Sequence, residues 1–335
     1  MNVLPIDYYL GFGEKSAVVT AIERALSSKV TIVTDYRKAD IIVIGPYGKR
    51  HMSPEIVNCT HCWKLFCTGE NVLPDYRYYH HSLTFSRFDF CGRNFRWPCW
   101  YHSFSMGREI DATYTFDETD RLIETNQPLV DPCSKEFWKR AVAIFNNMEP
   151  LRCHLFAAFD QRNKIDGVGG PFGNGFAWGD ETTYREKLSI LQNYGFNLCL
   201  ENSQSDGYYT EKILHARSMG CIAIVYSDPH VYNDFHKDGL VNLYDFDTVS
   251  ELVDHVLSLM SNKNEFELCA RSPIFSKKPD VMGVQQFISS SYSQFTEGTI
   301  NNTPVQYSDF TPVYKIPSKT DEVIHLLKKL IKTSV

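Results

Sequence analysis

The sequence predicts an α/β protein of two domains, each built around a parallel sheet. Short β-branched runs alternate with segments of helical periodicity in both halves of the chain, as they do in βαβ units. The length of 335 residues corresponds to roughly two domains at about 150 residues each. A polar stretch that includes Pro128 and Pro132 separates the two halves. We therefore expect one domain over 1–133 and a second over 134–335.

One helix and three strands are expected in the first 70 residues. Apolar side chains recur at three- and four-residue spacing over 16–28, which predicts an amphipathic helix. Three short runs rich in β-branched or other apolar residues predict strands at Lys29–Thr34, Asp40–Ile44 and Trp63–Cys67. Residues 76–104 are dense in aromatic side chains, and we expect irregular structure there with strands between.

The second half repeats the alternation of strands and helices. Strands are expected at Arg140–Phe145, Phe196–Leu200 and Cys221–Tyr226, and helices at Leu151–Phe159 and Tyr208–Met219. We expect Gly220 to end the second of these helices, because glycine readily adopts the left-handed conformation found at helix ends. Residues 167–175 form a glycine-rich loop, and 318–335 predict a terminal amphipathic helix.

Composition and charge exclude several classes of protein. The chain is 43% hydrophobic and 22% charged without a low-complexity run, which argues against a disordered or coiled-coil protein. The net charge of −6 argues against general attraction to nucleic acid or to an anionic membrane. No apolar run approaches the roughly 18 residues of a membrane span, and the first residues do not resemble a signal peptide. We therefore expect a soluble, cytoplasmic protein.

The cysteines and two short motifs were weighed as metal or phosphate sites. Ten cysteines in a chain of this length are too few for a disulfide scaffold, so reduced thiols are expected. Cys59-Thr60-His61-Cys62 is a single CxxC without a partner pair, and no zinc site is predicted there. Gly11–Ser16 lacks the spacing of a P-loop, and no clear strand precedes it.

A polar cluster between the Phe196–Leu200 strand and the helix that follows it is the first candidate site. Ligands of open α/β sheets bind beyond the carboxyl ends of the strands, where loops lead into helices. Residues 201–212 are too polar to pack in a core, and Lys212 puts a cation in the first helical turn, where the helix dipole disfavours it. An anion such as pyrophosphate explains this placement, and an ordinary solvated loop is the alternative.

Arg152 and Glu70 occupy similar positions after other strands. Arg152 begins the helix after the Arg140–Phe145 strand, where its guanidinium could bind a phosphate. Glu70 follows the Trp63–Cys67 strand, where a carboxylate could face a ligand. Taken alone, each residue is more often an ordinary surface arginine or a solvated loop acid.

Six segments resemble one known family. Residues 196–213, FNLCLENSQSDGYYTEKI, resemble the signature segment of the α-1,3/4-fucosyltransferases, which transfer L-fucose from GDP-fucose to N-acetylglucosamine-containing glycans. The other five segments follow in the family's order: LFCTGENVLPDY (65–76), FDFCGRNFRWPCWY (88–101), PLRCHLFAAF (150–159), DGVGGPFGNG (166–175) and GLVNLYDF (239–246). The likeness is to the short, soluble bacterial members of the family rather than to the Golgi enzymes.

The resemblance implies two facing Rossmann-like domains, the B-type glycosyltransferase architecture. The N-terminal domain would bind the acceptor and the C-terminal domain GDP-fucose. By matching position, Arg152 and Lys212 would hold the donor pyrophosphate, and Glu211 the ribose or fucose hydroxyls. Asn202 and Tyr208 would complete the donor pocket, and Glu70 takes the position of the general base.

The resemblance also implies a reaction. L-Fucose would move from GDP-β-L-fucose, with inversion, to a hydroxyl group, O3, of an N-acetylglucosamine- or glucose-containing oligosaccharide or glycoconjugate. We identify no Asp-x-Asp metal motif in the sequence, so no metal or other cofactor is expected. Two alternatives stay open: a transferase for another GDP-sugar, and a non-catalytic glycan- or nucleotide-binding protein of the same fold.

Two further regions carry an alternative interpretation. The strand Cys221–Tyr226 continues into Ser-Asp-Pro, which departs from the family's pattern and puts the wall of the sugar pocket near Tyr226–Asp228 in question. The lysines of 318–335 favour a solvated helix face, with weak peripheral contact to the inner membrane surface as the alternative.

Overall fold

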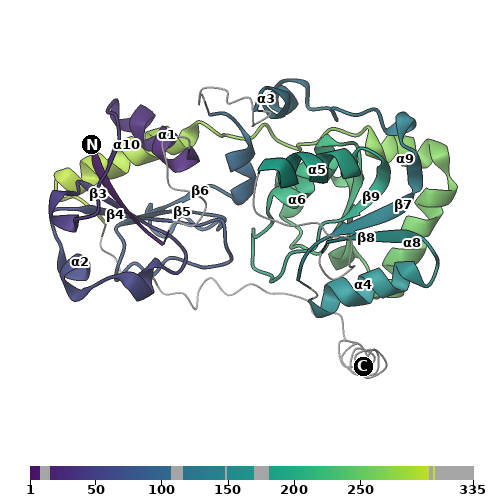
Figure 1. The fold of residues 1–335 in the computed structure, drawn as a ribbon, viewed down its shortest axis with the longest axis horizontal. Helices are drawn as coiled ribbons and strands as arrows, with labels where there is room; N and C mark the ends of the chain where they lie inside the picture. Colours follow the sequence, from purple (N-terminus) through teal and green to yellow (C-terminus); the bar gives the residue numbers. More distant parts are fainter. Residues whose placement is uncertain (8–15, 107–115, 148, 170–180, 302–304, 306–335) are drawn as a thin grey trace. The chain divides into compact units, whose positions relative to one another are not determined.

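Two separate parallel sheets with flanking helices make up the protein (Figure 1). The computed structural model describes residues 1–7, 16–106, 116–147, 149–169, 181–301 and 305. Most of the glycine-rich loop at 167–175, residues 11–15 of the Gly11–Ser16 motif and the whole of 318–335 lie outside the described residues. Every strand pair in both sheets is parallel, which confirms the predicted α/β class.

The first sheet has the strand order β2-β1-β3-β4-β5-β6. Its strands are β1 (Asn2–Ile6), β2 (Thr31–Ile32), β3 (Ile41–Ile44), β4 (Trp63–Cys67), β5 (His81–Thr84) and β6 (Asn94–Arg96). The three predicted strands are confirmed, although β2 keeps only two residues and both are exposed, as befits an edge strand. The predicted helix is α1 (Ala17–Leu26), whose first turn is capped by the Ser16 hydroxyl accepting from Val19 N.

Strand β1 was not predicted, because Pro5 interrupts its apolar run. Proline cannot donate to a ladder and argues against a central strand. In the structure Pro5 lies opposite Val43 of β3. On its other side β1 pairs with the short β2 only at Asn2 and Val3, so Pro5 has no partner residue in β2. The missing N–H therefore costs no hydrogen bond to β2.

The second sheet has the order β11-β10-β9-β7-β8. Its strands are β7 (Phe137–Ile144), β8 (Ile165–Val168), β9 (Tyr194–Leu198), β10 (Ile222–Val225) and β11 (Leu240–Asn242). Its helices are α3 (Phe116–Thr125), α4 (Pro150–Asp160), α5 (Glu181–Leu191), α6 (Glu211–Ser218), α7 (Val231–Asp234), α8 (Val249–Ser261) and α9 (Lys263–Ala270). Gly220 has φ +72°, and a Cβ atom there would lie 2.7 Å from Val130 O, so the predicted helix stop is confirmed.

In each sheet the direction in which successive strands are added reverses at one place. In the second sheet β8 lies on one side of β7 and β9 on the other, so the chain changes direction between β7 and β9. The same reversal occurs between β1 and β3 in the first sheet. Ligands of doubly wound sheets bind at such switch points, beyond the carboxyl ends of the strands.

The compact units depart from the predicted domains in three places. One unit comprises Met1–Asp111, Ser205–Thr210 and Pro279–Pro312, and the other comprises Ala112–Gln204, Glu211–Lys278 and Val313–Val335. The polar stretch at 112–133 thus belongs to the second unit, while 205–210 and α10 (Gly283–Thr296) belong to the first. A domain boundary placed from composition divides the chain only once. It therefore cannot show that a later segment packs with the first sheet.

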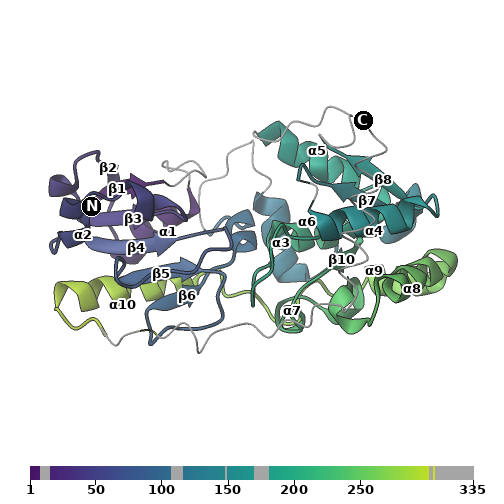
Figure 2. The same cartoon turned by 90° about the horizontal axis from the view of Figure 1, so that it is seen from below.

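Helix α10 covers the first sheet (Figure 2). Phe287 lies 5.9 Å from His81 of β5 and 5.6 Å from Phe95 of β6, measured between ring centroids. Tyr292 meets Trp63 of β4 edge to face at 5.8 Å. These aromatic contacts attach the helix to the first unit. Across the described residues, no helix combines the length and apolarity needed to cross a membrane.

Two adjacent histidines beneath this helix predict that acid will destabilise the fold. Burial and the charges of neighbouring cations lower the pKa of His80 to about 3, and burial lowers the pKa of His81 to about 4. Both residues take up protons more readily in the unfolded chain, near pH 6.5. Their neutral forms therefore contribute stability above pH 6.5, and this contribution is lost as the pH falls toward 4. Between pH 7 and 5 the loss should be on the order of 1–2 kcal/mol per histidine.

Urea unfolding at pH 7 and pH 5 measures this effect. His81→Gln should reduce the fall in stability, because glutamine does not titrate and can still accept the 3.0 Å hydrogen bond from Trp63 Nε1. His51→Gln is the matched control, since His51 is exposed. An unchanged pH dependence in His81→Gln would contradict the assignment.

Candidate active site

The side chain of Arg152 forms hydrogen bonds with the loops after β7 and β9, at the switch point of the second sheet. It lies in the first turn of α4, behind Pro150, and is only 4% exposed. Its Nε and Nη2 donate to Leu200 O, just past β9, at 3.2 and 2.7 Å, and its Nη1 donates to Asn147 O at 3.0 Å. The guanidinium is thus held by backbone carbonyls at the place where a ligand is expected.

Lys212 forms a short ion pair with the residue that directly follows Leu200. Its Nζ lies 2.6 Å from Oε2 of Glu201, whose side chain is 5% exposed, against 22% for that of Lys212. Burial alone would lower the pKa of Lys212, but the carboxylates of Glu201 and Glu211 outweigh it and raise that pKa. Lys212 is therefore a permanent cation in the first turn of α6.

Glu211 is paired with a lysine that sequence reasoning missed. Lys187 of α5 is buried, and its Nζ lies 3.4 Å from Glu211 Oε1. Burial would raise the pKa of Glu211, but the charges of Lys212, Lys187 and His215 lower it overall. Glu211 is therefore an ionised hydrogen-bond acceptor. The sequence pattern of α5 contains a signal for this buried role of Lys187. Lys187 lies four residues before the buried Leu191, so a charged side chain occupies the helix face that packs inward.

Tyr208 lies outside the helix that was predicted to contain it. Helix α6 begins at Glu211, and Tyr208 belongs to the 205–210 segment of the first unit. Its ring is 5% exposed and meets Phe85 edge to face at 5.0 Å. The prediction was wrong because the apolar residues before Glu211 pack on the first unit instead of continuing the helical face.

Backbone and arginine contacts attach this segment to the first unit. Gly207 has φ +75°, and a Cβ atom there would lie 2.9 Å from Phe85 O, so only glycine fits. Arg96 donates from Nη1 to Gly207 O at 3.2 Å and from Nη2 to Tyr209 Oη at 2.9 Å. Arg87 also donates to the Tyr209 hydroxyl. The predicted donor cluster at 201–212 is thus divided between the two units.

Glu70 and Asn202 lie in short connections after strands. Glu70 follows β4 and is half-buried; its N–H donates to Thr68 Oγ1 at 2.9 Å, and its carbonyl accepts from Val72 N at 2.8 Å. These bonds fix the backbone that carries the carboxylate. Asn202 is exposed after β9, with Ser203 Oγ 3.5 Å from its Oδ1. Glu70 belongs to the first unit and Asn202 to the second.

One Asp-x-Asp pair was overlooked in the sequence. Asp245-Phe246-Asp247 follows β11, and both aspartates are exposed. The hydroxyl of Tyr232 donates to Asp245 Oδ2. This turn stands two strands away from β9 in the sheet order, so it does not belong to the group of charges around Arg152 and Lys212.

Two family models match the chain. The model of the C-terminal domain of glycosyltransferase family 10 (fucosyltransferase) matches residues 136–268. The model of the N-terminal domain of alpha-(1,3)-fucosyltransferase FucT matches residues 4–103. Each model covers one of the two parallel sheets apart from short segments at its ends.

Two curated proteins show similarity along part of their length. An alpha-(1,3)-fucosyltransferase FucT from Helicobacter pylori is 28% identical over 249 residues, which is 68% of this chain and 50% of that protein. A putative fucosyltransferase R654 from Acanthamoeba polyphaga mimivirus is 23% identical over 139 residues, 39% of this chain and 23% of that protein. The chain thus spans half the length of the first relative and about a quarter of the second.

Solved structures share the fold. A crystal structure of alpha1,3-fucosyltransferase with GDP matches with a TM-score of 0.64 at 21% identity, covering 91% of each chain. A crystal structure of alpha1,3-fucosyltransferase with GDP-fucose matches with a TM-score of 0.63 at 19% identity, covering 91% of this chain and 92% of that one. These likenesses extend over both sheets and support the predicted B-type architecture.

Proposed function

Since the chain belongs to glycosyltransferase family 10, the fucosyltransferases, we propose that it transfers L-fucose from GDP-β-L-fucose to a glycan hydroxyl. The acceptor group is O3 of an N-acetylglucosamine- or glucose-containing oligosaccharide or glycoconjugate. The observation that carries the proposal is the pair of cations at the β7/β9 switch point. Arg152 donates to Leu200 O, and Lys212 forms its ion pair with Glu201, the next residue in the chain. Two neighbouring cations suit a diphosphate.

The leaving group is GDP, whose pyrophosphate gains negative charge as the bond to C1 of fucose breaks. Lys212 and Arg152 stabilise that charge, together with backbone N–H groups in the first turns of α4 and α6. Glu201 holds Lys212 through the 2.6 Å ion pair and so acts as a positioning residue. With these cations supplying the charge, we propose that transfer needs no metal ion.

The nucleophile is the acceptor hydroxyl, which must lose its proton. A β-linked donor and an α-linked product require one displacement with inversion at C1, through an oxocarbenium-like transition state. We assign proton removal to the carboxylate of Glu70, as general base. The hydroxyl oxygen bonds to C1, the C1–O bond to GDP breaks, and Glu70 passes the proton to solvent.

Glu211 orients the donor. Its carboxylate is kept ionised by Lys187 and Lys212, so it can accept hydrogen bonds from ribose or fucose hydroxyls. Lys187 holds Glu211 at 3.4 Å and is therefore a positioning residue for the donor sugar. Asn202 and Tyr208 complete the donor pocket in this proposal.

The wall near Tyr226–Asp228 bears on which sugar is accepted. The peptide group of Ser227 is fixed by Asn242, whose Oδ1 accepts from Ser227 N at 3.1 Å and whose Nδ2 donates to Ser227 O at 2.9 Å. Asp228 Oδ1 accepts from His230 N at 2.9 Å. This rigid wall departs from the family's sequence pattern, so a transferase for another GDP-sugar is the second candidate function.

We base the proposed cellular compartment on the GDP-fucose donor and on the cysteine thiols. All ten cysteines are free in the structure, which suits a reducing compartment. We propose that the enzyme works in the cytoplasm, with a peripheral contact at the inner membrane surface as an additional possibility for 318–335, which lies outside the described residues.

One experiment tests the function against its alternatives. The protein is incubated with GDP-fucose or GDP-mannose and with lactose, N-acetyllactosamine or chitobiose, each with and without EDTA. We expect a fucosylated product from GDP-fucose that EDTA does not reduce, with the linkage read by NMR. Product from GDP-mannose alone would indicate the second donor, and GDP binding without product from any donor would indicate a non-catalytic binding protein.

A further inference from the structure

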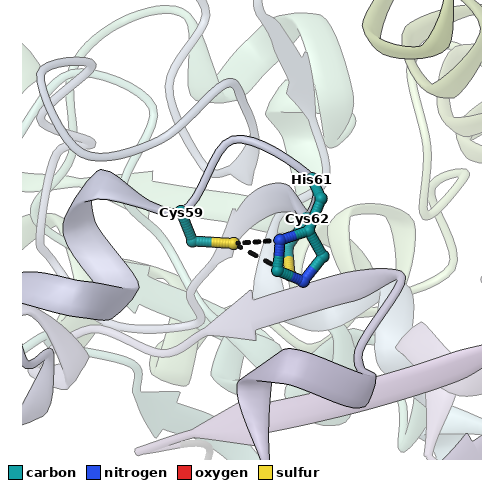
Figure 3. Close-up of side chains that lie close together, drawn as sticks. All are labelled: Cys59, His61 and Cys62. Carbon is teal, nitrogen blue, oxygen red and sulfur yellow. Dashed lines mark hydrogen bonds between the residues drawn. The ribbon is translucent and has the colours of Figure 1, made fainter.

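Three soft donor atoms converge in the connection between α2 (Pro54–Asn58) and β4 (Figure 3). Sγ of Cys59, a ring nitrogen of His61 and Sγ of Cys62 all lie within 4.8 Å of one another. Cys59 Sγ is 3.3 Å from His61 Nδ1. Both cysteines are buried, and the histidine is exposed. The sequence motif suggested only two thiols, and the structure adds an imidazole directed at one of them.

We propose that Cys59, His61 and Cys62 bind a zinc ion. Zinc prefers thiolate and imidazole ligands, with Zn–S near 2.3 Å and Zn–N near 2.0–2.1 Å. In a tetrahedral complex such bonds separate the donor atoms by roughly 3.4–3.8 Å. Cys59 Sγ and His61 Nδ1 lie close to that range at 3.3 Å, and Cys62 Sγ lies within 4.8 Å of both side chains' donor atoms, so rotations of the side chains would complete the site. Water can take the fourth position from the exposed side of His61.

The hydrogen bond on the far side of the imidazole supports a ligand role. His61 Nε2 lies 3.3 Å from Tyr36 O. A backbone carbonyl only accepts, so this contact places the ring proton on Nε2 and leaves the lone pair of Nδ1 facing Cys59. Histidines that ligate metals commonly donate their other ring N–H to a carbonyl or carboxylate in this way.

Two backbone carbonyl groups hold the buried thiol of Cys62. In the metal-free protein its thiol donates to Tyr36 O at 3.3 Å and to Ala39 O at 3.1 Å. Metal binding displaces the thiol protons to solvent, so zinc affinity should rise steeply with pH.

The position of the site indicates a structural role. Cys59 is the C-cap of α2, and Cys62 directly precedes Trp63, the first residue of β4. The site therefore stands at the amino end of β4, whereas Glu70 follows its carboxyl end. A bound ion would fasten α2 to the start of β4 without entering the proposed transfer chemistry. This inference does not depend on the proposed function.

Cobalt titration of the full chain tests the proposal. The protein is reduced, freed of metal and titrated with Co²⁺, whose thiolate bonds give a near-ultraviolet charge-transfer band. We expect one Co²⁺ per chain, displaced by Zn²⁺, and a rise in Tm with Zn²⁺. His61→Ala should weaken binding 10-fold or more, and Cys59→Ser 100-fold or more. His61 is exposed, so its variant separates loss of a ligand from loss of folding.

Cys91→Ser is the matched control, because Cys91 is an exposed thiol in the connection between β5 and β6. It should bind cobalt as the unsubstituted chain does. Reduced, folded protein that shows no thiolate band would overturn the proposal, as would His61→Ala and Cys59→Ser variants that keep full affinity. A Cys59–Cys62 disulfide in the protein as purified, together with no cobalt binding after reduction, would identify the pair as a redox couple instead.

Discussion

Replacing Lys212 with methionine is expected to lower kcat/KM for fucosyl transfer by a factor of about 10² or more, as loss of one charge-stabilising donor does elsewhere. Lys212 Nζ is the cation that we assign to the leaving pyrophosphate, and the neighbouring carboxylates raise its pKa, so its charge is present at all working pH values. Methionine keeps the apolar stem and removes only the charge. Steady-state rates with GDP-fucose and a fixed acceptor measure the loss.

The same substitution should also destabilise the fold, and the two effects must be separated. Lys212→Met leaves Glu201 as a buried carboxylate without its 2.6 Å partner, which costs roughly 3 kcal/mol at the lower end for a broken buried pair. The double variant Glu201→Gln with Lys212→Met removes both charges. We expect it to recover most of the lost stability in urea unfolding, while transfer stays about 10²-fold lower.

Other results would assign Lys212 differently. If the double variant regained activity along with stability, the lysine would only neutralise Glu201. If Lys212→Met bound GDP and turned over at the rate of the unsubstituted enzyme, Lys212 would lie outside the phosphate site. Glu201→Gln alone should keep GDP binding and lower kcat, because the ammonium stays but loses the partner that holds it.

Strands that are buried along their whole length and mostly apolar were predictable. Ile41–Ile44, Trp63–Cys67 and Ile222–Val225 are buried at every position, and both faces of a parallel sheet demand that pattern. The site residues that follow such strands were predictable for the same reason. Arg152 and Lys212 could be placed at the carboxyl edge of one sheet because strand ends and helix starts are local features of the sequence.

Features that depend on distant packing were not predictable. Tyr208 continues an apolar pattern into α6, yet the positive φ of Gly207 and the contact with Phe85 remove it from the helix. Lys187 becomes part of the site only because α5 brings it to Glu211, 24 residues later in the chain. In the sequence, helix α10 is an ordinary amphipathic segment. Only the contact of Phe287 with His81 shows that it packs on the first sheet. In each case the deciding contact joins residues far apart in sequence.

Replacing Glu70 with glutamine is expected to lower kcat by about 10²–10⁴, the range for loss of a general base, while leaving the Kd for GDP unchanged. Glutamine keeps the shape of the side chain, and the backbone of Glu70 is held by hydrogen bonds from Glu70 N to Thr68 Oγ1 at 2.9 Å and from Val72 N to Glu70 O at 2.8 Å. The substitution therefore removes the proton acceptor without moving the chain that carries it.

The separation of turnover from GDP binding gives a readout that a structural role would not produce. With Glu70 as the base, kcat should fall in Glu70→Gln while the Kd for GDP stays that of the unsubstituted enzyme. Glu124→Gln in α3 is the matched control, because Glu124 is exposed on the second unit. GDP affinity measured by calorimetry completes the test. If GDP affinity fell as far as the rate, Glu70 would support the fold and another group would remove the proton.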